Sequence, residues 1–185
     1  IRPCYEDGEE GVPWDVRRIG RDEPALLDVI SMSLAKDGPH RDIQPENRRI
    51  LKGAWKKVGR ATKRQIAKYR QKSGLLLHNT DRRVGVRKLR ALEPADRRSL
   101  CLVRAEVEFF TEGSYRGKRV CASFEHDAGI SIPLRYVLPV TDFEFERDFT
   151  SYEEAEAECY LTLSLGTPWE KDNNCYKFVA GVIEL

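Results

Sequence analysis

The sequence lacks an apolar run long enough to cross a membrane. Its longest uninterrupted apolar stretch, residues 178–183, is far shorter than the ~20 residues that a spanning helix needs. We therefore expect no transmembrane segment. With 185 residues, of which 41% are hydrophobic and 34% charged, the chain has the composition of a soluble globular protein that can bury a substantial core.

The sequence also lacks the motifs of common metal and cofactor sites. It has no glycine-rich phosphate loop, no G-x-S-x-G and no H-E-x-x-H. Its five cysteines lie far apart, with no C-x-x-C pair and no histidine at zinc-finger spacing. They are Cys4, Cys101, Cys121, Cys159 and Cys175. We expect no metal and no cofactor, and the odd number of cysteines favours free thiols in an intracellular protein, cytoplasmic or nuclear.

Groups suited to acid–base catalysis are few. Only His40, His78 and His126 are available as histidine acid–base groups, and each lies in or beside a turn. Glu106 and Glu108 share one face of a predicted strand, where they would suit a metal-dependent nuclease. Alternating glutamates are also typical of the solvated face of a sheet. We expect a protein that is not an enzyme, with the nuclease as the enzymatic alternative.

Charge is abundant and strongly segregated along the chain. Residues 41–98 contain 19 basic and 5 acidic residues, a net charge of +14, whereas residues 1–40 carry −4 and residues 99–185 carry −8. Such asymmetry indicates a polyanionic partner. The alternative is that the basic segment packs against the acidic part of the same chain.

We predict that residues 1–20 form an N-terminal arm and that residues 21–98 form a helical, basic segment. Apolar spacing predicts one helix that begins at Asp22 and ends before Gly38, and a second over about 46–72. The second helix would place Trp55 and Tyr69 on its apolar face, opposite most of the basic side chains. We therefore interpret both rings as core residues rather than as platforms for nucleic-acid bases.

Residues 99–185 change to a period of two, which predicts antiparallel strands. Strands are expected over about 101–110, 120–124, 130–138, 143–145, 159–165 and 175–185. Pro133 and Pro139 place the third at a sheet edge. Ser151 and Glu154 resemble a helical capping box, whereas alternation toward Cys159 indicates a strand, so residues 152–158 stay open between helix and strand. The predicted fold class is α+β, with a helical basic N-terminal half packed with an antiparallel sheet of five or six strands, and residues 21–185 as one folded unit.

The basic segment predicts a non-enzymatic nucleic-acid-binding protein, with RNA favoured over DNA. Arginine outnumbers lysine by 12 to 7 over residues 41–98, and its planar fork of donors suits phosphate. The residues expected to contact phosphates from the basic amphipathic helix and its continuation are Lys52, Lys56, Arg60, Lys63, Arg64, Arg70, Arg82, Arg83, Arg87 and Lys88.

The alternative is a structural or assembly protein, matrix-like or scaffold-like. Its basic half would bind an acidic protein or the surface of an anionic membrane, and opposite charges would also permit a homo-oligomer. We prefer nucleic acid to a membrane because the apolar face of the predicted helix is small and includes Thr62.

Overall fold

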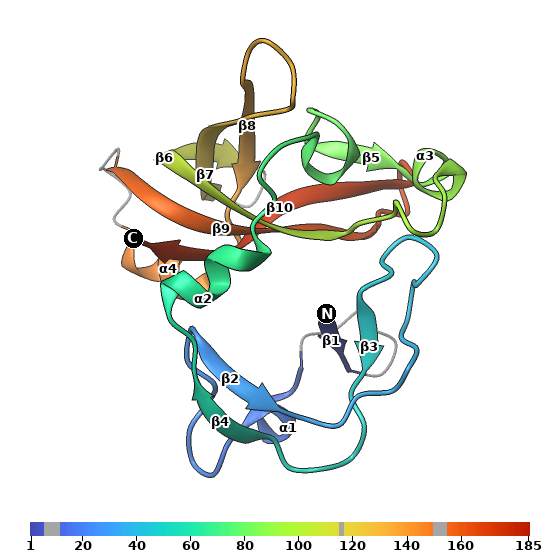
Figure 1. Cartoon of the computed structure of the whole chain (residues 1–185), viewed down its shortest axis with the longest axis vertical. Coiled ribbons are helices and arrows are strands. Elements are labelled where there is room, and N and C mark those ends of the chain that lie inside the picture. Colours follow the sequence, from blue (N-terminus) through green and yellow to red (C-terminus); the bar gives the residue numbers. More distant parts are fainter. Residues whose placement is uncertain (6–11, 115–116, 150–154) are drawn as a thin grey trace. The chain divides into compact units, whose positions relative to one another are not determined.

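The computed structural model describes residues 1–5, 12–114, 117–149 and 155–185. The chain divides into two compact units, Ile1–Lys68 and Tyr69–Leu185 (Figure 1). Strands account for 46% of the structure and helices for 15%. The predicted α+β class, with a helical N-terminal half, is therefore wrong, and the protein is mainly β. The expected boundary between residues 98 and 99 lies inside the second unit. Within the described residues, no helix has the length and apolar character to cross a bilayer.

The first unit consists of short strands, short helices and connecting loops. Its elements are β1 (Arg2–Cys4), α1 (Trp14–Arg17), β2 (Asp28–Ser31), β3 (Asn47–Arg49), β4 (Lys56–Arg60) and α2 (Lys63–Ile66). The 3-10 turn η1 (Ala67–Tyr69) spans the boundary between the units. β1 and β3 pair in parallel, and β2 and β4 pair antiparallel. Residues 6–11 of the predicted arm lie outside the described residues.

Neither predicted helix forms over its expected range, and both ranges contain mainly short strands and loops. Where the first was expected, Asp28–Ser31 is a strand, and Leu26 and Val29 are 48% and 42% exposed. Where the second was expected, β3, β4 and the four-residue helix α2 follow one another. The apolar spacing did not mark a buried face, because helical periodicity has meaning only where a face packs against a core.

A buried amide network stabilises the first unit. Asn47 is 2% exposed and Gln44 is 3% exposed. The Asn47 Nδ2 donates to the Pro39 carbonyl (2.7 Å) and to Gln44 Oε1 (2.8 Å), and its Oδ1 accepts from Arg2 Nη1 (3.0 Å). A Cβ on Gly38 would come within 2.6 Å of the Asn47 backbone, so only glycine fits at this position.

The second unit is built on one six-stranded sheet. Its elements are the 3-10 turn η2 (Leu76–His78), β5 (Arg83–Gly85), α3 (Val86–Ala91), β6 (Leu100–Ser114), β7 (Gly117–His126), β8 (Leu134–Pro139), α4 (Phe143–Asp148), β9 (Ala155–Pro168) and β10 (Asn174–Glu184). The strand order is β5-β10-β9-β6-β7-β8, and the paired strands are antiparallel.

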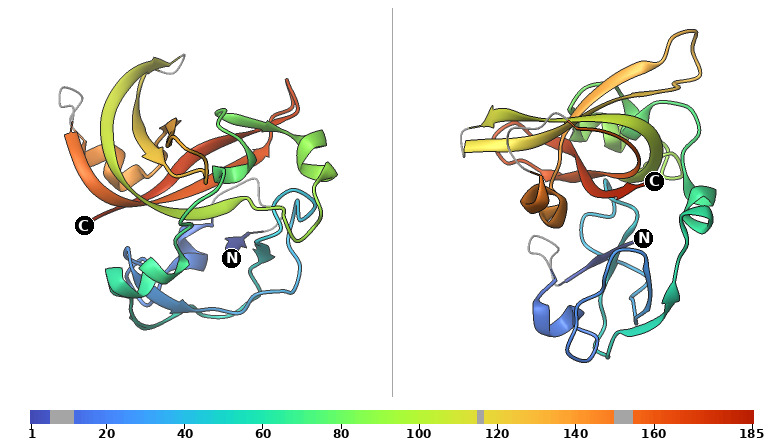
Figure 2. Two further views of the ribbon diagram at one scale, coloured as in Figure 1. Left: turned by 45° about the horizontal axis from the view of Figure 1, so that its top comes forward. Right: turned by 90° about the vertical axis from the view of Figure 1, so that its left-hand side faces the viewer.

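The sheet curls into a partly open barrel. The order β9-β6-β7-β8 is a Greek key, and β6, whose bend is visible in Figure 2, pairs with β7 on one side and β9 on the other. A parallel bridge between Val140 and Val179 joins the end of β8 to β10, supported by the Thr141 N–H, which donates to the Val179 carbonyl (2.8 Å).

The sequence located most strands of this sheet. β6, β7 and β10 lie where alternation placed them, and β8 is an edge strand that begins only at Leu134. The open question over residues 152–158 is answered for 155–158, which belong to β9, while residues 151–154 lie outside the described residues. The short strand predicted near Phe143 is wrong. Asp142 Oδ1 accepts from the Phe145 N–H (3.2 Å) and starts helix α4 there.

The barrel encloses the main core. Val107 of β6 and Leu161 and Leu163 of β9 are at most 1% exposed. The core also holds Lys177, 1% exposed, whose Nζ donates to the carbonyls of Leu76 (2.8 Å) and Asn79. Burial lowers the pKa of Lys177 to about 8. All five cysteines lie within the described residues and are not disulfide-bonded; four of them are buried and Cys101 is half-buried.

Candidate nucleic-acid interface

The chain contains a long stretch without a carboxylate. Residues 47–80 include eleven lysines and arginines and no aspartate or glutamate. The structure shows that this stretch is β3, β4, α2 and the turns that follow rather than one helix. Its positive charge is therefore distributed over strands, loops and a short helix.

The most exposed part is a surface that we call the β4–α2 surface, formed by Lys56, Lys57, Arg60, Lys63 and Arg64. Every residue of β4 is exposed, because the strand pairs only with β2. Thr62 begins α2 with a capping box, in which its Oγ1 accepts from the Gln65 N–H (3.2 Å) and its own N–H donates to Gln65 Oε1 (2.7 Å). The cap holds the two basic residues of α2 directly after β4.

One carboxylate neutralises part of this surface. Asp28 of β2, whose side chain is 4% exposed, lies 2.6 Å from Lys57 Nζ and 3.8 Å from Arg60 Nη1. The hydrogen bond from Lys57 lowers the pKa of Asp28 from its ordinary value. Among the residues that the structure describes, Lys56, Lys63 and Arg64 have no such ion pair, so these cations are free to meet a phosphate.

A second group of basic residues lies in the second unit, on what we call the β5–α3 surface: Arg82, Arg83, Arg87 and Lys88. Two of the four form ion pairs with acidic residues of the second unit. Arg82 Nη1 lies 3.0 Å from Glu112 Oε1, and Arg83 Nη1 lies 3.2 Å from Asp172 Oδ2.

Two residues of this surface are held in ion pairs, whereas among the described residues the other two are not. The hydrogen bond from Arg82, joined by one from Arg119, lowers the pKa of Glu112 to about 2. Arg87 and Lys88 of α3 are exposed and have no ion pair within the described part of the chain. They are the available cations of the β5–α3 surface.

The ten residues predicted to contact phosphate therefore do not share one face. Lys56, Arg60, Lys63 and Arg64 lie together in the first unit, and Lys52 lines a separate cleft of that unit. The four residues of the β5–α3 surface belong to the second unit, as does Arg70, which is half-buried and whose backbone forms a parallel bridge with Leu102. Their role in binding stays a prediction.

Exposed aromatic rings are present in the second unit. Tyr69 is 80% exposed, so its predicted place in a core is wrong, whereas Trp55 is half-buried. Sequence reasoning missed Trp169, 46% exposed in the loop between β9 and β10. A tryptophan within a run of turn-forming residues was the available signal.

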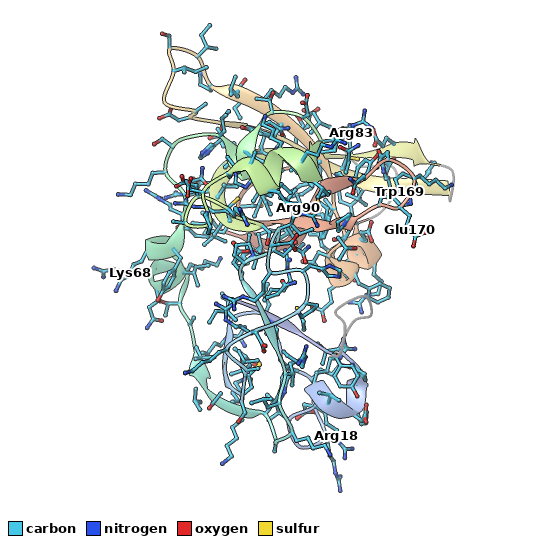
Figure 3. All side chains as sticks on the ribbon, turned by 90° about the vertical axis from the view of Figure 1, so that its right-hand side faces the viewer. Arg18, Lys68, Arg83, Arg90, Trp169 and Glu170 are labelled. Carbon is cyan, nitrogen blue, oxygen red and sulfur yellow. The ribbon has the colours of Figure 1, made fainter. Side chains whose placement is uncertain are left out.

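The β9–β10 loop places a cation beside an aromatic pair. The Trp169 ring packs edge-on against Tyr176 with centroids 5.5 Å apart, and Lys171 Nζ lies 5.5 Å from the Trp169 centroid. Tyr176 also donates a hydrogen bond to Asp172 Oδ2 (2.6 Å), the same oxygen that pairs with Arg83. Figure 3 shows Arg83 and Trp169 on the same side of the second unit.

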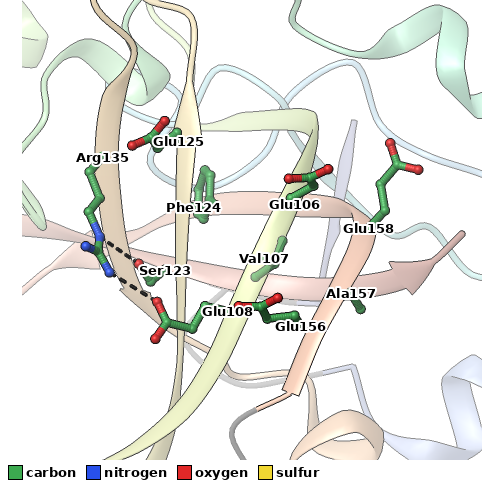
Figure 4. A pocket seen from close by; sticks show the side chains of 10 residues that line it. All are labelled: Glu106, Val107, Glu108, Ser123, Phe124, Glu125, Arg135, Glu156, Ala157 and Glu158. Carbon is green, nitrogen blue, oxygen red and sulfur yellow. Dashed lines mark hydrogen bonds and ion pairs between the residues drawn. The ribbon is translucent and has the colours of Figure 1, made fainter.

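The outer face of the barrel carries the opposite charge. A cleft of about 770 Å³ lies over β6, β7, β8 and β9. Its acidic side chains, drawn in Figure 4, are Glu106, Glu108, Glu125, Glu156 and Glu158. Glu106 of β6 lies directly opposite Glu158 of β9, and Glu108 lies opposite Glu156. Like charges placed opposite one another in this way are unfavourable.

Two arginines offset this acidic face in part. Arg104 lies 2.6 Å from Glu158 Oε1, and Arg135 lies 3.1 Å from Glu108 Oε2. No group of three metal-ligating side chains is present within the described residues, so the predicted nuclease pair, Glu106 and Glu108, lacks a third ligand there. The face repels phosphate, and we exclude it from the candidate interface.

The topology defines the class of protein. A partly open, five-stranded Greek-key barrel, formed here by β6, β7, β8, β9 and β10, is an OB fold. The chain belongs to the Dual OB-containing domain family (DuOB), which matches residues 1–182. Within the described residues, one barrel of this kind is present in the second unit, and the first unit has the short strand pairs β1–β3 and β2–β4. No curated protein and no solved structure matches the chain.

Proposed function

We propose that the chain is a non-enzymatic nucleic-acid-binding protein that contacts the phosphate backbone of RNA. The observation that carries this proposal is the carboxylate-free stretch over residues 47–80, in which Lys56, Lys63 and Arg64 are exposed and have no ion pair among the described residues. OB folds as a class bind oligonucleotides and oligosaccharides, often through the loop between their fourth and fifth strands. That loop is residues 169–173 here, and it carries Trp169 and Lys171.

Exposed aromatic rings favour single-stranded RNA over duplex DNA. Reading of the DNA major groove typically uses a helix or a two-stranded ribbon that enters it and does not require aromatic rings. The basic residues of the β4–α2 surface lie on the two-stranded pair β2–β4 and on the four-residue helix α2, so the rings, rather than the shape of these elements, support RNA. Exposed rings such as Tyr69 and Trp169, beside lysine and arginine, are suited instead to stacking on unpaired bases.

The test is a binding titration by fluorescence anisotropy against single-stranded RNA, duplex RNA and duplex DNA of equal length. If about six phosphates are neutralised, the affinity falls by roughly 10³-fold between 50 and 200 mM salt. The triple variant Lys56→Glu/Lys63→Glu/Arg64→Glu should weaken RNA binding by at least about 10-fold and reduce the salt slope by about 2.

The matched control is Arg21→Glu/Lys36→Glu/Arg41→Glu, which reverses three exposed cations of the same unit outside the β4–α2 surface. It changes the net charge by the same amount and should cost much less affinity. Absence of binding to every nucleic acid at low salt would overturn the proposal, and so would equal losses in the two triple variants.

The acidic outer face of the barrel supports a second candidate, an assembly protein. Its five glutamates could receive a basic surface of another copy or of a different protein. Light scattering over a range of protein and salt concentrations tests this function. A constant monomeric mass under all conditions would remove self-assembly.

A further inference from the structure

The first unit contains a cleft that the phosphate contacts proposed above do not use. It has a volume of about 660 Å³, within the range of small-molecule sites. We call it the Trp55 cleft. Its charged and aromatic walls include Tyr5, Arg18, Arg49, Lys52 and Trp55.

The backbone explains why these side chains converge. β1 and β3 run parallel, and the Ile50 N–H donates to the Cys4 carbonyl (2.9 Å), which places Tyr5 next to the end of β3. Gly53, with φ of 150°, then turns the chain between Lys52 and Trp55. Because residues with a side chain rarely adopt this φ, the shape of this wall depends on glycine.

The electrostatics of the cleft favour an anion. Arg18, Arg49 and Lys52 are exposed, and none has an ion pair among the described residues. Asp15 is the single carboxylate in the described lining, so the lining has a net charge of +2. Arginine and lysine together suit a phosphate group, which arginine contacts with two parallel donors and lysine as a point charge.

The remaining walls favour a flat, apolar body next to that anion. Trp55 and Tyr5 supply aromatic rings, and Val16 and Ile50 supply half-buried aliphatic surface. The Trp55 indole N–H is buried and has no acceptor among the described residues. Aromatic walls beside unpaired cations provide both parts of nucleotide recognition, stacking of a base and neutralisation of a phosphate.

We propose that the Trp55 cleft binds one nucleotide, with its base against Trp55 and Tyr5 and its phosphate at Arg49 and Lys52. The nucleotide is either a free mononucleotide or one unit of a bound single strand. In the second case the inference rests on the proposed function. Both sources share the same chemistry, and the experiment below separates them.

The fluorescence of Trp55 provides a direct readout. The chain has three tryptophans, so Trp14→Phe/Trp169→Phe leaves Trp55 as the only one. This variant is titrated with AMP, with a ten-residue oligoadenylate and with ribose 5-phosphate, which lacks a base. Saturable quenching by AMP, by the oligoadenylate or by both, without an effect of ribose 5-phosphate, is the expected result, because stacking requires the base.

A charge reversal in the same background tests the phosphate contact. Arg49→Glu/Lys52→Glu should raise the Kd obtained from the quenching titration by at least about 10-fold, equivalent to roughly 1.4 kcal/mol. Lys36→Glu/Arg41→Glu, which changes charge by the same amount outside the cleft lining, should leave it nearly unchanged. Equal effects of the two pairs would overturn the phosphate assignment.

The outcomes separate this inference from the proposed function. Quenching by the oligoadenylate alone supports a strand as the source, and quenching by AMP without retention of any nucleic acid supports a free nucleotide while the proposed function fails. RNA binding in the anisotropy titration without any quenching of Trp55 overturns the cleft proposal and leaves the proposed function standing.

Discussion

The two units of the chain are stabilised by different kinds of contact. Among the described residues, 24 buried apolar side chains lie in the second unit and only two, Cys4 and Ile43, lie in the first. Most of those in the second unit lie on the long barrel strands β6, β7, β9 and β10. The first unit joins strands of three to five residues and relies on the buried amides of Asn47 and Gln44.

This difference shows where charge can be displayed. A long, fully paired strand must bury one face, so half of its positions are reserved for apolar residues. β4, paired on one side and without a buried residue, can expose basic side chains along its whole length. The unit with the smaller core can therefore expose basic side chains along a whole strand.

The largest expected contrast is in core truncation. Leu163→Ala, at a residue with no exposure, should lower the free energy of unfolding by about 2–5 kcal/mol. Leu51→Ala makes the same chemical change in the first unit at a side chain that is 46% exposed, and should cost less than about 1 kcal/mol. Urea unfolding followed by circular dichroism measures both, and similar losses would contradict the contrast between the two cores.

The second expected contrast is in pH dependence. The pKa of Lys177 is about 8 in the folded protein, compared with 10.5 for an ordinary, solvated lysine. Between these values the unfolded chain binds more protons, so the contribution of Lys177 to stability increases with pH. Relative to Lys177→Met, the wild-type protein should gain on the order of 3 kcal/mol between pH 8 and 10.5.

Comparing the two proteins at each pH removes other titrations, such as that of Cys121, whose pKa is raised to about 11 by burial. Urea unfolding at several pH values provides the measurement. A constant difference between wild type and Lys177→Met would show that the buried amine does not titrate in this range.

The smallest expected effect concerns the amide network of the first unit. Asn47→Ala removes three hydrogen bonds, to Arg2, Pro39 and Gln44, from a buried position, which should cost about 1–3 kcal/mol. Hydrogen exchange should accelerate at the Arg2 N–H, which donates to the Glu46 carbonyl, and stay unchanged across β6 and β9. Faster exchange throughout the barrel would instead mean that the two units unfold together.

The sequence predicted the barrel strands well because their burial is one-sided. Val103, Val107 and Phe109 are buried on one face of β6 while Arg104 and Glu106 are exposed on the other, so alternation reports the fold directly. The first unit offers no such face, and its apolar spacing matched a helix by coincidence.

Local sequence also failed at particular residues for identifiable reasons. Gly53 and Gly59 disfavour a helix and were the clearest sequence evidence against the second predicted helix. In the structure Gly53 lies in a turn and Gly59 in β4. The candidate phosphate contacts were found from charge alone. Their division between two units, and the Trp55 cleft, depend on strand pairings that the sequence does not encode locally.

The edges of the barrel sheet have a consequence for self-association. At one edge β5 is only three residues long, and at the other β8 ends in Pro139 and is joined to β10 by the bridge at Val140. An exposed row of backbone donors and acceptors is what allows sheets to grow by adding strands. Within the described residues the terminal strands β5 and β8 have only three and six residues, so we expect the sheet to offer short edges to added strands despite containing a strand of fifteen residues.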